Sequence, residues 1–204
     1  PRATEIGTYQ VLLDETPVRD ALMDTELPLL HLVGSSPDLA ASEIELIDVE
    51  NRSFRLRDAL LPVMHDYDFI VVDCPPSLGL LTINALCAAE MVVVPLQCEY
   101  YALEGLSQLV DTIERVRASL NQRLAIHGVL LTMFDRRNNL ANEVAAEVKR
   151  HFPVYDTVIP RNVRLAEAPS HGKPVILYDA SSRGSYGYLN LAREILDALP
   201  EAAA

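Results

Sequence analysis

An aspartate that ends a run of apolar residues is the first candidate for chemistry in this sequence. Asp73 follows Phe69–Val72 directly, and two prolines, a serine and a glycine come soon after it. A short apolar run bounded by turn residues predicts a buried strand of a parallel sheet, and open α/β sheets bind ligands at the carboxyl ends of such strands. In nucleotide hydrolases with a phosphate-binding loop, an aspartate at this place holds magnesium. These residues alone equally allow Asp73 to be a turn or helix-cap residue.

The other reactive residue types form no pattern that predicts a second kind of chemistry. The five histidines are scattered along the chain and include no pair spaced to place two zinc ligands on one helix face. Ser77 and Ser170 have no neighbouring base, so nucleophilic catalysis has no support. The three cysteines are Cys74, Cys87 and Cys98. Their spacing favours buried, reduced thiols of a cytoplasmic protein over a disulfide framework or a shared iron–sulfur centre.

The elements that would position Asp73 alternate in type along the chain. Apolar runs predict strands at 27–33, 69–72, 91–95, 124–133 and 154–159, and a brief apolar piece at 175–177. Helical periodicity predicts helices at 53–67, 79–90, 103–120, 140–152 and 186–199, and short helices at 38–48 and within 7–24, broken at Pro17. This alternation favours an α/β fold with a doubly wound, mostly parallel sheet and helices on both faces. No repeat or linker interrupts the chain, so residues 1–204 are predicted to form a single domain.

Composition describes an ordinary globular chain whose charge is unevenly distributed. Half of the 204 residues are hydrophobic, and the net charge is −12. All of this excess lies in residues 1–100, because residues 101–204 carry twelve basic and twelve acidic residues. Eight basic residues and five acids lie between Arg136 and Arg183. An acidic protein can bind nucleic acid if its cations gather on one face, but composition alone favours an ordinary solvated surface.

Four motifs, in order along the chain, resemble the ParA/Soj family of chromosome and plasmid partition ATPases. They are Asp73–Gly79, Pro95–Gly105, Gly128–Asp135 and Ile159–Pro174. The likeness extends over nearly the whole chain. It implies a P-loop-type fold that binds ATP and magnesium, forms a homodimer around the nucleotide, and then binds DNA without sequence preference. It also implies a ParB-type partner that stimulates hydrolysis, and a cytoplasmic, nucleoid-associated protein.

The same resemblance implies roles for residues around the nucleotide. Asp73 would be the magnesium-side aspartate of the Walker B strand. The switch segment that senses the γ-phosphate would contain Pro75, Pro76, Ser77 and Gly79. The adenine would be framed by Thr132, Met133, Pro160, Arg161 and Asn162.

Basic residues in the second half of the chain match the family's DNA-contact positions. Arg137 and Arg164 are the stronger matches, and Lys173 and Arg183 are further candidates. Arginines on loops or helix ends can bind phosphates bidentately without reading bases. Without the resemblance, surface ion pairs would be the favoured interpretation of Arg137 and Arg164.

The family's phosphate-binding loop is not found in these residues. No stretch matches G-x-x-x-x-G-K-[ST] or its deviant, lysine-bearing form, and the family places this loop and a second acidic motif ahead of the region that begins at Pro1. The chain is therefore expected to be a fragment, or to begin at a misplaced start, and not to hydrolyse ATP as written. Since the strand leading into that loop is central in the family's sheet, its neighbours should expose apolar flanks.

Two alternatives are left open: a MinD-like positioning ATPase, and a non-enzymatic DNA- or ParB-binding relic. The MinD branch ends in a basic amphipathic membrane helix, whereas residues 189–201 carry one arginine and three acids, which argues against membrane binding. The relic differs from the partition ATPase only in whether the gene begins at Pro1. Glu99–Tyr101 could form a partner surface, but aromatic residues at a strand-to-helix junction are more often packed.

Overall fold

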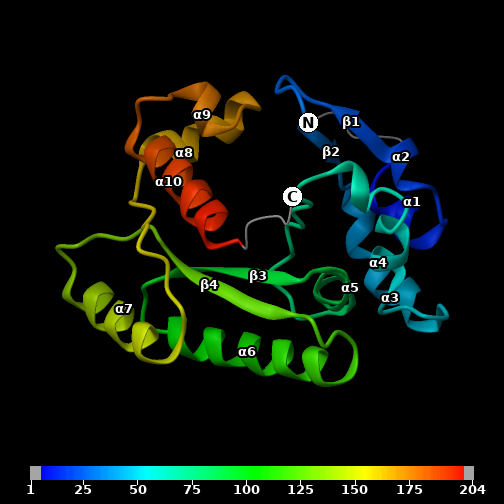
Figure 1. The fold of residues 1–204 in the computed structure, drawn as a ribbon, viewed down its shortest axis with the longest axis horizontal. Helices are drawn as coiled ribbons and strands as arrows, with labels where there is room; N and C mark the ends of the chain where they lie inside the picture. The colour runs from blue at the N-terminus through cyan, green and yellow to red at the C-terminus, as the bar shows by residue number, and fades with distance from the viewer. Residues whose placement is uncertain (1–5, 200–204) are drawn as a thin grey trace. The chain divides into compact units, whose positions relative to one another are not determined.

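A computed structural model describes residues 6–199, which fall into two compact units. Unit 1 consists of Pro1–Glu90 and Asp111–Ala125, and unit 2 of Met91–Val110 and Ile126–Ala204. Helix α6 (Ala102–Ser119) and strand β4 (Ala125–Thr132) contribute residues to both units. Figure 1 labels the helices and strands. The single domain expected over residues 1–204 stays a prediction.

Unit 2 is built around strand β4. This strand is hydrogen-bonded to β3 (Met91–Gln97). It also pairs with segment 153–160: Val129 N–H donates to the Pro153 carbonyl (2.8 Å), and Ile159 N–H donates to the Leu131 carbonyl (2.9 Å). Two isolated bridges, Val129–Val154 and Phe134–Pro160, are both parallel. The strands predicted at 91–95 and 124–133 are confirmed, and the one at 154–159 is confirmed as short stretches of parallel pairing.

Helices pack on both faces of the sheet in unit 2 because β4 is apolar on both faces. Val129 and Leu131 are buried with residues of α6 and of α7 (Asn139–His151). Leu130 instead packs with Tyr155, Ile159 and Leu191 of α10 (Arg183–Ala198). Successive side chains of a strand point to opposite faces, so the two clusters lie on opposite sides of β4, as the helices do in Figure 1. The predicted doubly wound α/β fold is confirmed.

Strand β3 is buried on one face only. Val94 and Leu96 are buried in the cluster that contains Val129, whereas Met91 and Val93 are exposed. The sequence predicted a strand buried on both faces, and this part of the prediction is wrong. The reason is that β4 is the only strand paired with β3 within residues 6–199.

Side-chain caps begin three helices of unit 2. An oxygen of Asn138 accepts from Leu140 N–H at the start of α7 (3.0 Å), and one of Asn162 accepts from Arg164 N–H at the start of α8 (Val163–Glu167; 2.8 Å). Ser182 Oγ accepts from Ser185 N–H at the start of α10 (3.1 Å). Such caps satisfy amides that lack a partner within the helix. A 3₁₀ turn (Ala168–His171) and helix α9 (Val175–Tyr178) connect α8 to α10, so the apolar piece at 175–177 is helical.

Unit 1 is mainly helical and has its own small core, made of Val11, Val18, Ala21 and Val63. Its helices are α1 (Thr8–Leu13), α2 (Val18–Ala21), α3 (Ser42–Glu45), α4 (Arg55–Leu60) and α5 (Leu80–Ala88), with 3₁₀ turns at Pro37–Ala40, Leu46–Asp48 and Met64–Asp66. Strands β1 (Leu22–Asp24) and β2 (His31–Val33) form an antiparallel hairpin. The break at Pro17 and the helix at 79–90 are confirmed. The helices predicted at 38–48 and 53–67 are divided into shorter pieces, and only the end of 27–33 is a strand.

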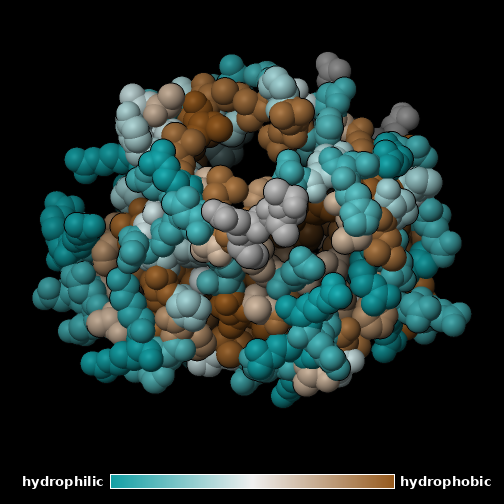
Figure 2. Space-filling model, viewed as in Figure 1, coloured by the Kyte–Doolittle hydropathy of each residue, from teal (hydrophilic) through white to brown (hydrophobic). Residues whose placement is uncertain are grey.

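The strand predicted at Phe69–Val72 is not formed. These residues belong to no helix or strand, and the side chains of Phe69, Ile70 and Val71 are 48%, 42% and 89% exposed. A buried strand needs a neighbour to bond its amides and carbonyls, and within residues 6–199 no strand pairs with this segment. The prediction of a buried strand here is therefore wrong. Hydrophobic side chains reach the surface in several places (Figure 2).

Candidate functional site

The segment that carries Asp73 lies in unit 1 and leads into helix α5. Asp73 is exposed and belongs to no strand, so the strand-end position predicted for it is wrong. The turn after it is held locally: Thr82 Oγ1 donates to the Ser77 carbonyl (2.5 Å), and Ile83 N–H donates to the Gly79 carbonyl (3.0 Å). Gly79 is the N-cap of α5 and offers no side-chain acceptor. Pro75, Pro76 and Ser77 are exposed, so this segment is accessible to a ligand.

Glu43 of helix α3 lies against Gly79, a contact that the sequence did not suggest. A Cβ atom added at Gly79 would overlap the Glu43 carboxylate. Oε1 of Glu43 is buried and has no hydrogen-bond partner. Leaving a buried acceptor without a partner costs about 1–3 kcal/mol. Segment 75–79 therefore ends against an unsatisfied carboxylate, which would have to shift if residue 79 carried a side chain.

The carboxyl ends of two parallel segments lie side by side in unit 2. Phe134 N–H donates to the Ile159 carbonyl (3.0 Å), and Phe134 pairs with Pro160. Thr132 and Met133, at the end of β4, are thereby brought next to 160–162. Met133 has a φ of 48°, a left-handed backbone conformation that is uncommon for a residue with a side chain. Because α/β sheets bind ligands at such strand ends, this edge is a candidate ligand site.

Asp135 and Arg137 form an ion pair just beyond this edge. Asp135 Oδ1 accepts from Arg137 N–H (3.0 Å) and Nε (3.1 Å), and Oδ2 accepts from Nη2 (2.9 Å). These hydrogen bonds lower the pKa of Asp135 to about 2, and the charge of Arg161 contributes in the same direction. They also raise the pKa of Arg137. The Arg137 side chain is 90% exposed, so it is accessible although its guanidinium already has a partner.

Arg164 at the start of α8 is held by two carboxylates. Its Nη1 donates to Glu167 Oε2 (2.8 Å), and its Nε lies 3.3 Å from Asp179 Oδ2. The hydrogen bond between Arg164 and Glu167 raises the pKa of the guanidinium and lowers that of the carboxyl. Tyr178 OH also donates to Glu167 Oε2 (3.2 Å). The surface ion pairs that the bare sequence favoured for Arg137 and Arg164 are thus both present.

Lys173 and Arg183 differ from these two arginines. Both are exposed and make no ion pair within residues 6–199. Lys173 follows Gly172, which ends a 3₁₀ turn with a φ of 64°, and Arg183 is the first residue of α10. All four basic candidates therefore lie in unit 2, and two of them carry unpaired charge.

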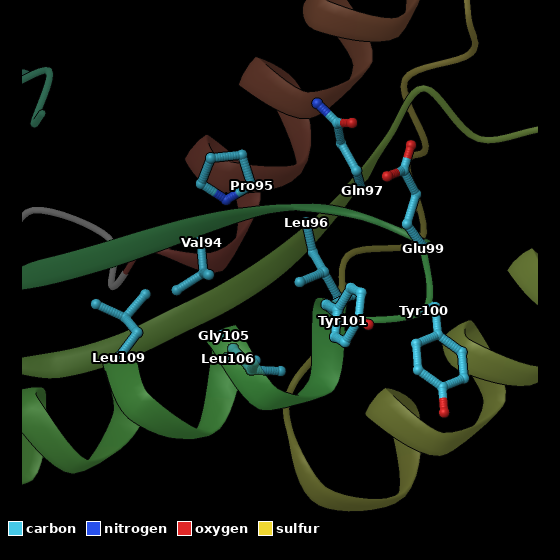
Figure 3. A pocket seen from close by; sticks show the side chains of 11 residues that line it. Val94, Pro95, Leu96, Gln97, Glu99, Tyr100, Tyr101, Gly105, Leu106 and Leu109 are labelled. Atoms are coloured by element: carbon cyan, nitrogen blue, oxygen red, sulfur yellow. The ribbon is translucent and has the colours of Figure 1, made fainter. Parts of the chain in front are cut away.

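A hollow of about 450 Å³ lies between β3 and the start of α6 (Figure 3). Apolar side chains such as Leu96, Leu106 and Leu109 line it, and Glu99 lies at its rim. Tyr100 and Tyr101 are 75% and 74% exposed and contact each other edge to face, with ring centroids 5.0 Å apart. The expectation that these tyrosines are packed is wrong, because the strand-to-helix junction turns both rings outward.

Metal-binding groups do not cluster in the part of the chain that the structure describes. Residues 6–199 contain no group of three or more His, Cys, Asp or Glu side chains that could hold a metal ion. A single aspartate that binds magnesium through water, the role expected of Asp73, does not need such a group. Cys87 and Cys98 are buried, as expected, but Cys74 is exposed. Within the same residues, no helix is both long and apolar enough to cross a membrane.

Comparison with known proteins places the chain in a family. A family model described as an AAA domain matches residues 2–126. The chain is 55% identical over 190 residues to the chromosome partitioning protein ParA of Myxococcus xanthus, an alignment that covers 92% of this chain and 67% of that protein. It is 56% identical over 189 residues to the sporulation initiation inhibitor protein Soj of Bacillus subtilis, covering 92% and 75%. The chain belongs to the ParA/Soj family of chromosome partitioning ATPases.

A solved structure supports the fold of this ParA/Soj chain. The cobyrinic acid a,c-diamide synthase of Mycobacterium smegmatis, with bound ADP and magnesium, superposes with a TM-score of 0.81 and 32% identity, covering 96% of this chain and 73% of that one. The P-loop NTPase-like fold predicted from the sequence is thereby confirmed. The family is assigned from the partition proteins because their identity to this chain is much higher.

The structure brings some of the predicted site residues together. Within unit 2, Thr132 and Met133 lie beside Pro160 and the cap of α8, whereas Asp73 and segment 75–79 belong to unit 1. Sequence reasoning missed Glu43, Glu167 and Asp179. The three-residue spacing of Arg164 and Glu167 on one helix was a usable signal, whereas Glu43 and Asp179 come close to their partners only through the fold.

Proposed function

We propose that this ParA/Soj protein binds ATP and magnesium, forms a homodimer around the nucleotide, and binds DNA without sequence preference. A ParB-type partner then stimulates hydrolysis, and the protein acts in the cytoplasm on the nucleoid. The observation that carries the proposal is the identity of 55–56% with proteins named ParA and Soj over 92% of the chain. The structural neighbour with bound ADP and magnesium supports the choice of nucleotide and metal.

The residues of this chain fit the adenine end of the nucleotide better than the phosphate end. Thr132, Met133 and 160–162 lie at adjacent strand ends, where backbone groups and side chains can frame an adenine. Asp73 and segment 75–79 are accessible for the magnesium and the γ-phosphate. The glycine- and lysine-bearing loop that would hold the phosphates is not among residues 1–204. These 204 residues alone are therefore expected not to hydrolyse ATP, and hydrolysis that Asp73→Ala abolishes would contradict this.

The DNA role is assigned to basic residues of unit 2. Arg137, Arg164, Lys173 and Arg183 are all exposed there, and arginine and lysine bind phosphate oxygens irrespective of base sequence. Unit 2 contains nine basic and eleven acidic residues, whereas unit 1 contains eight basic and eighteen acidic residues, which favours unit 2 as the side that meets a polyanion.

Retention on a linear DNA duplex tests this assignment in the protein as its native cell produces it, with ATP and magnesium. Arg164→Glu should weaken retention several-fold without changing the far-UV spectrum. Arg150→Glu is the matched control, because Arg150 is also an exposed arginine paired with a glutamate three residues away on a helix of unit 2. Equal losses in both variants would mean that only net charge matters and would remove Arg164 from the DNA site.

A second candidate, left open by the sequence, is a nucleotide-free binding relic. Mass spectrometry of the N-terminal peptide in the native cell separates the two. A peptide that extends upstream through a glycine-lysine loop identifies a working ATPase. A peptide that begins at Pro1, with DNA retention that does not depend on ATP, identifies the relic.

A further inference from the structure

The surroundings of Arg164 contain more negative than positive charge. Its guanidinium contacts Glu167 through Nη1 and Asp179 through Nε. One arginine between two carboxylates leaves a local charge of −1. A DNA phosphate that approaches Arg164 therefore meets a guanidinium whose Nη1 and Nε already have partners, and the summed charge of these three side chains repels it.

Both carboxylates are held in place by groups other than Arg164. Glu167 Oε2 accepts from Tyr178 OH (3.2 Å), and the Tyr178 ring is stacked on that of His171, with centroids 4.8 Å apart. Asp179 Oδ1 accepts from the N–H (3.1 Å) and the hydroxyl (2.8 Å) of Ser181, which leaves Oδ2 for the arginine. The negative charges therefore stay where they are when Arg164 turns away.

Arg164 is distinguished from the other basic candidates by this arrangement. Arg137 is paired with one carboxylate, that of Asp135, and Lys173 and Arg183 make no ion pair within the described residues. A pair of one arginine and one carboxylate is neutral, whereas the group of Arg164, Glu167 and Asp179 is negative. Burial does not prevent a DNA phosphate from replacing a carboxylate at Arg164, because the side chains of Arg164 and Glu167 are 51% and 38% exposed.

We propose that Glu167 and Asp179 form a clamp that competes with DNA phosphate for Arg164 and so sets the affinity of the protein for DNA. This inference rests on the proposed function. The clamp weakens DNA binding and keeps it easily reversible, because a phosphate contact through Nη1 or Nε of Arg164 competes with Glu167 or Asp179 for the same donor. The competition follows from the occupied donors Nη1 and Nε and from the charge count, and the shifted pKa values of Arg164 and Glu167 agree with a formed ion pair.

The test compares two single substitutions that remove the same charge from similar ion pairs. Glu167→Gln neutralises the clamp, while its amide oxygen can still accept from Tyr178. Glu147→Gln is the control: Glu147 is 41% exposed and accepts from Arg150 Nη1 at 2.8 Å, three residues along α7. Retention on a linear DNA duplex is measured from low to high salt, with ATP and magnesium, in the protein as its native cell produces it.

Glu167→Gln should bind DNA about two- to fivefold tighter than Glu147→Gln, the range expected when an exposed ion pair no longer competes. The difference should be largest at low salt and shrink as salt screens both interactions. Asp179→Asn, whose amide oxygen can still accept from Ser181, should change affinity in the same direction.

Two results overturn the clamp. Equal retention of Glu167→Gln and Glu147→Gln would show that Glu167 does not compete with DNA, and weaker retention of Glu167→Gln would show that it positions Arg164 instead. If the unsubstituted protein does not bind DNA, the proposed function fails and the clamp fails with it. The first two results leave the DNA function standing, so the two failures are distinguishable.

Discussion

Replacing Gly128 with alanine should destabilise the protein, because the ring of Tyr155 fills the space that a side chain would need. A Cβ atom at residue 128 would lie 2.7 Å from Cε2 and 2.9 Å from Cζ of that ring. Tyr155 is buried with Leu130 and Ile159, and its hydroxyl is hydrogen-bonded to Nδ1 of His127. The ring therefore cannot move aside without losing this packing or this hydrogen bond.

The size of the effect follows from two opposing contributions. Overpacking a tightly packed core costs about 1–3 kcal/mol. Alanine also reduces the conformational entropy of the unfolded chain, which stabilises the folded state by about 0.4–1 kcal/mol. The net loss for Gly128→Ala should be roughly 0.5–2 kcal/mol in the free energy of unfolding.

Gly105→Ala is the matched control. Gly105 lies in helix α6, where an added Cβ atom meets nothing within 4 Å. Alanine should there stabilise the protein by about 0.5–1 kcal/mol. Urea unfolding followed by far-UV circular dichroism measures both variants against the unsubstituted protein. If Gly128→Ala were as stabilising as Gly105→Ala, the close approach of Tyr155 to β4 would be refuted.

Two further predictions concern the candidate sites. The folded-state pKa of Asp135 is about 2, below its ordinary value of 3.8, so its pairing with Arg137 stabilises the protein above that ordinary value and is lost as pH falls through about 2. The melting temperature of Asp135→Asn should therefore lie below that of the unsubstituted protein at pH 6, and the difference should shrink towards pH 2. A difference that does not depend on pH would show that the ion pair does not stabilise the protein. Gly79→Ala should destabilise the protein only slightly, because the overlapping Glu43 carboxylate is the end of a flexible side chain and can shift, and the double variant Gly79→Ala/Glu43→Ala should lose less than the sum of its two single variants in urea unfolding. Additive losses would show that the two residues do not interact.

The elements of unit 2 were predictable because local pattern and tertiary packing agree there. The alternating contacts of β4 with helices on both faces require consecutive apolar residues, and Val129–Leu131 provide them within a run that is broken only at His127–Gly128. Helices α6, α7 and α10 each have a regular apolar stripe and begin and end close to their predicted bounds. In these elements the same side chains determine both the local structure and the core.

The segment before Asp73 was not predictable in the same way. Phe69–Val72 has as strong an apolar pattern as β4, yet a strand forms only where a neighbour pairs with its backbone. The sequence of a segment indicates that it prefers to form a buried strand, but whether it does so depends on a neighbouring strand formed by other residues of the chain. The same dependence explains why Val93 of β3 is exposed. Val93 lies in the apolar run 91–95, which predicted a buried strand, but within residues 6–199 only β4 pairs with β3.

Counting charges along the sequence also gave an incomplete description of the candidate DNA site. Eight basic residues and five acids lie between Arg136 and Arg183, which predicts a modest positive excess. The fold directs two of those acids, Glu167 and Asp179, onto Arg164. If the proposed DNA role holds, the positive potential that DNA meets comes first from Lys173 and Arg183, which make no ion pair within residues 6–199. Under the proposed clamp, a phosphate that binds Nη1 or Nε of Arg164 must displace a carboxylate, so the placement of these acids would set how strongly the protein binds DNA.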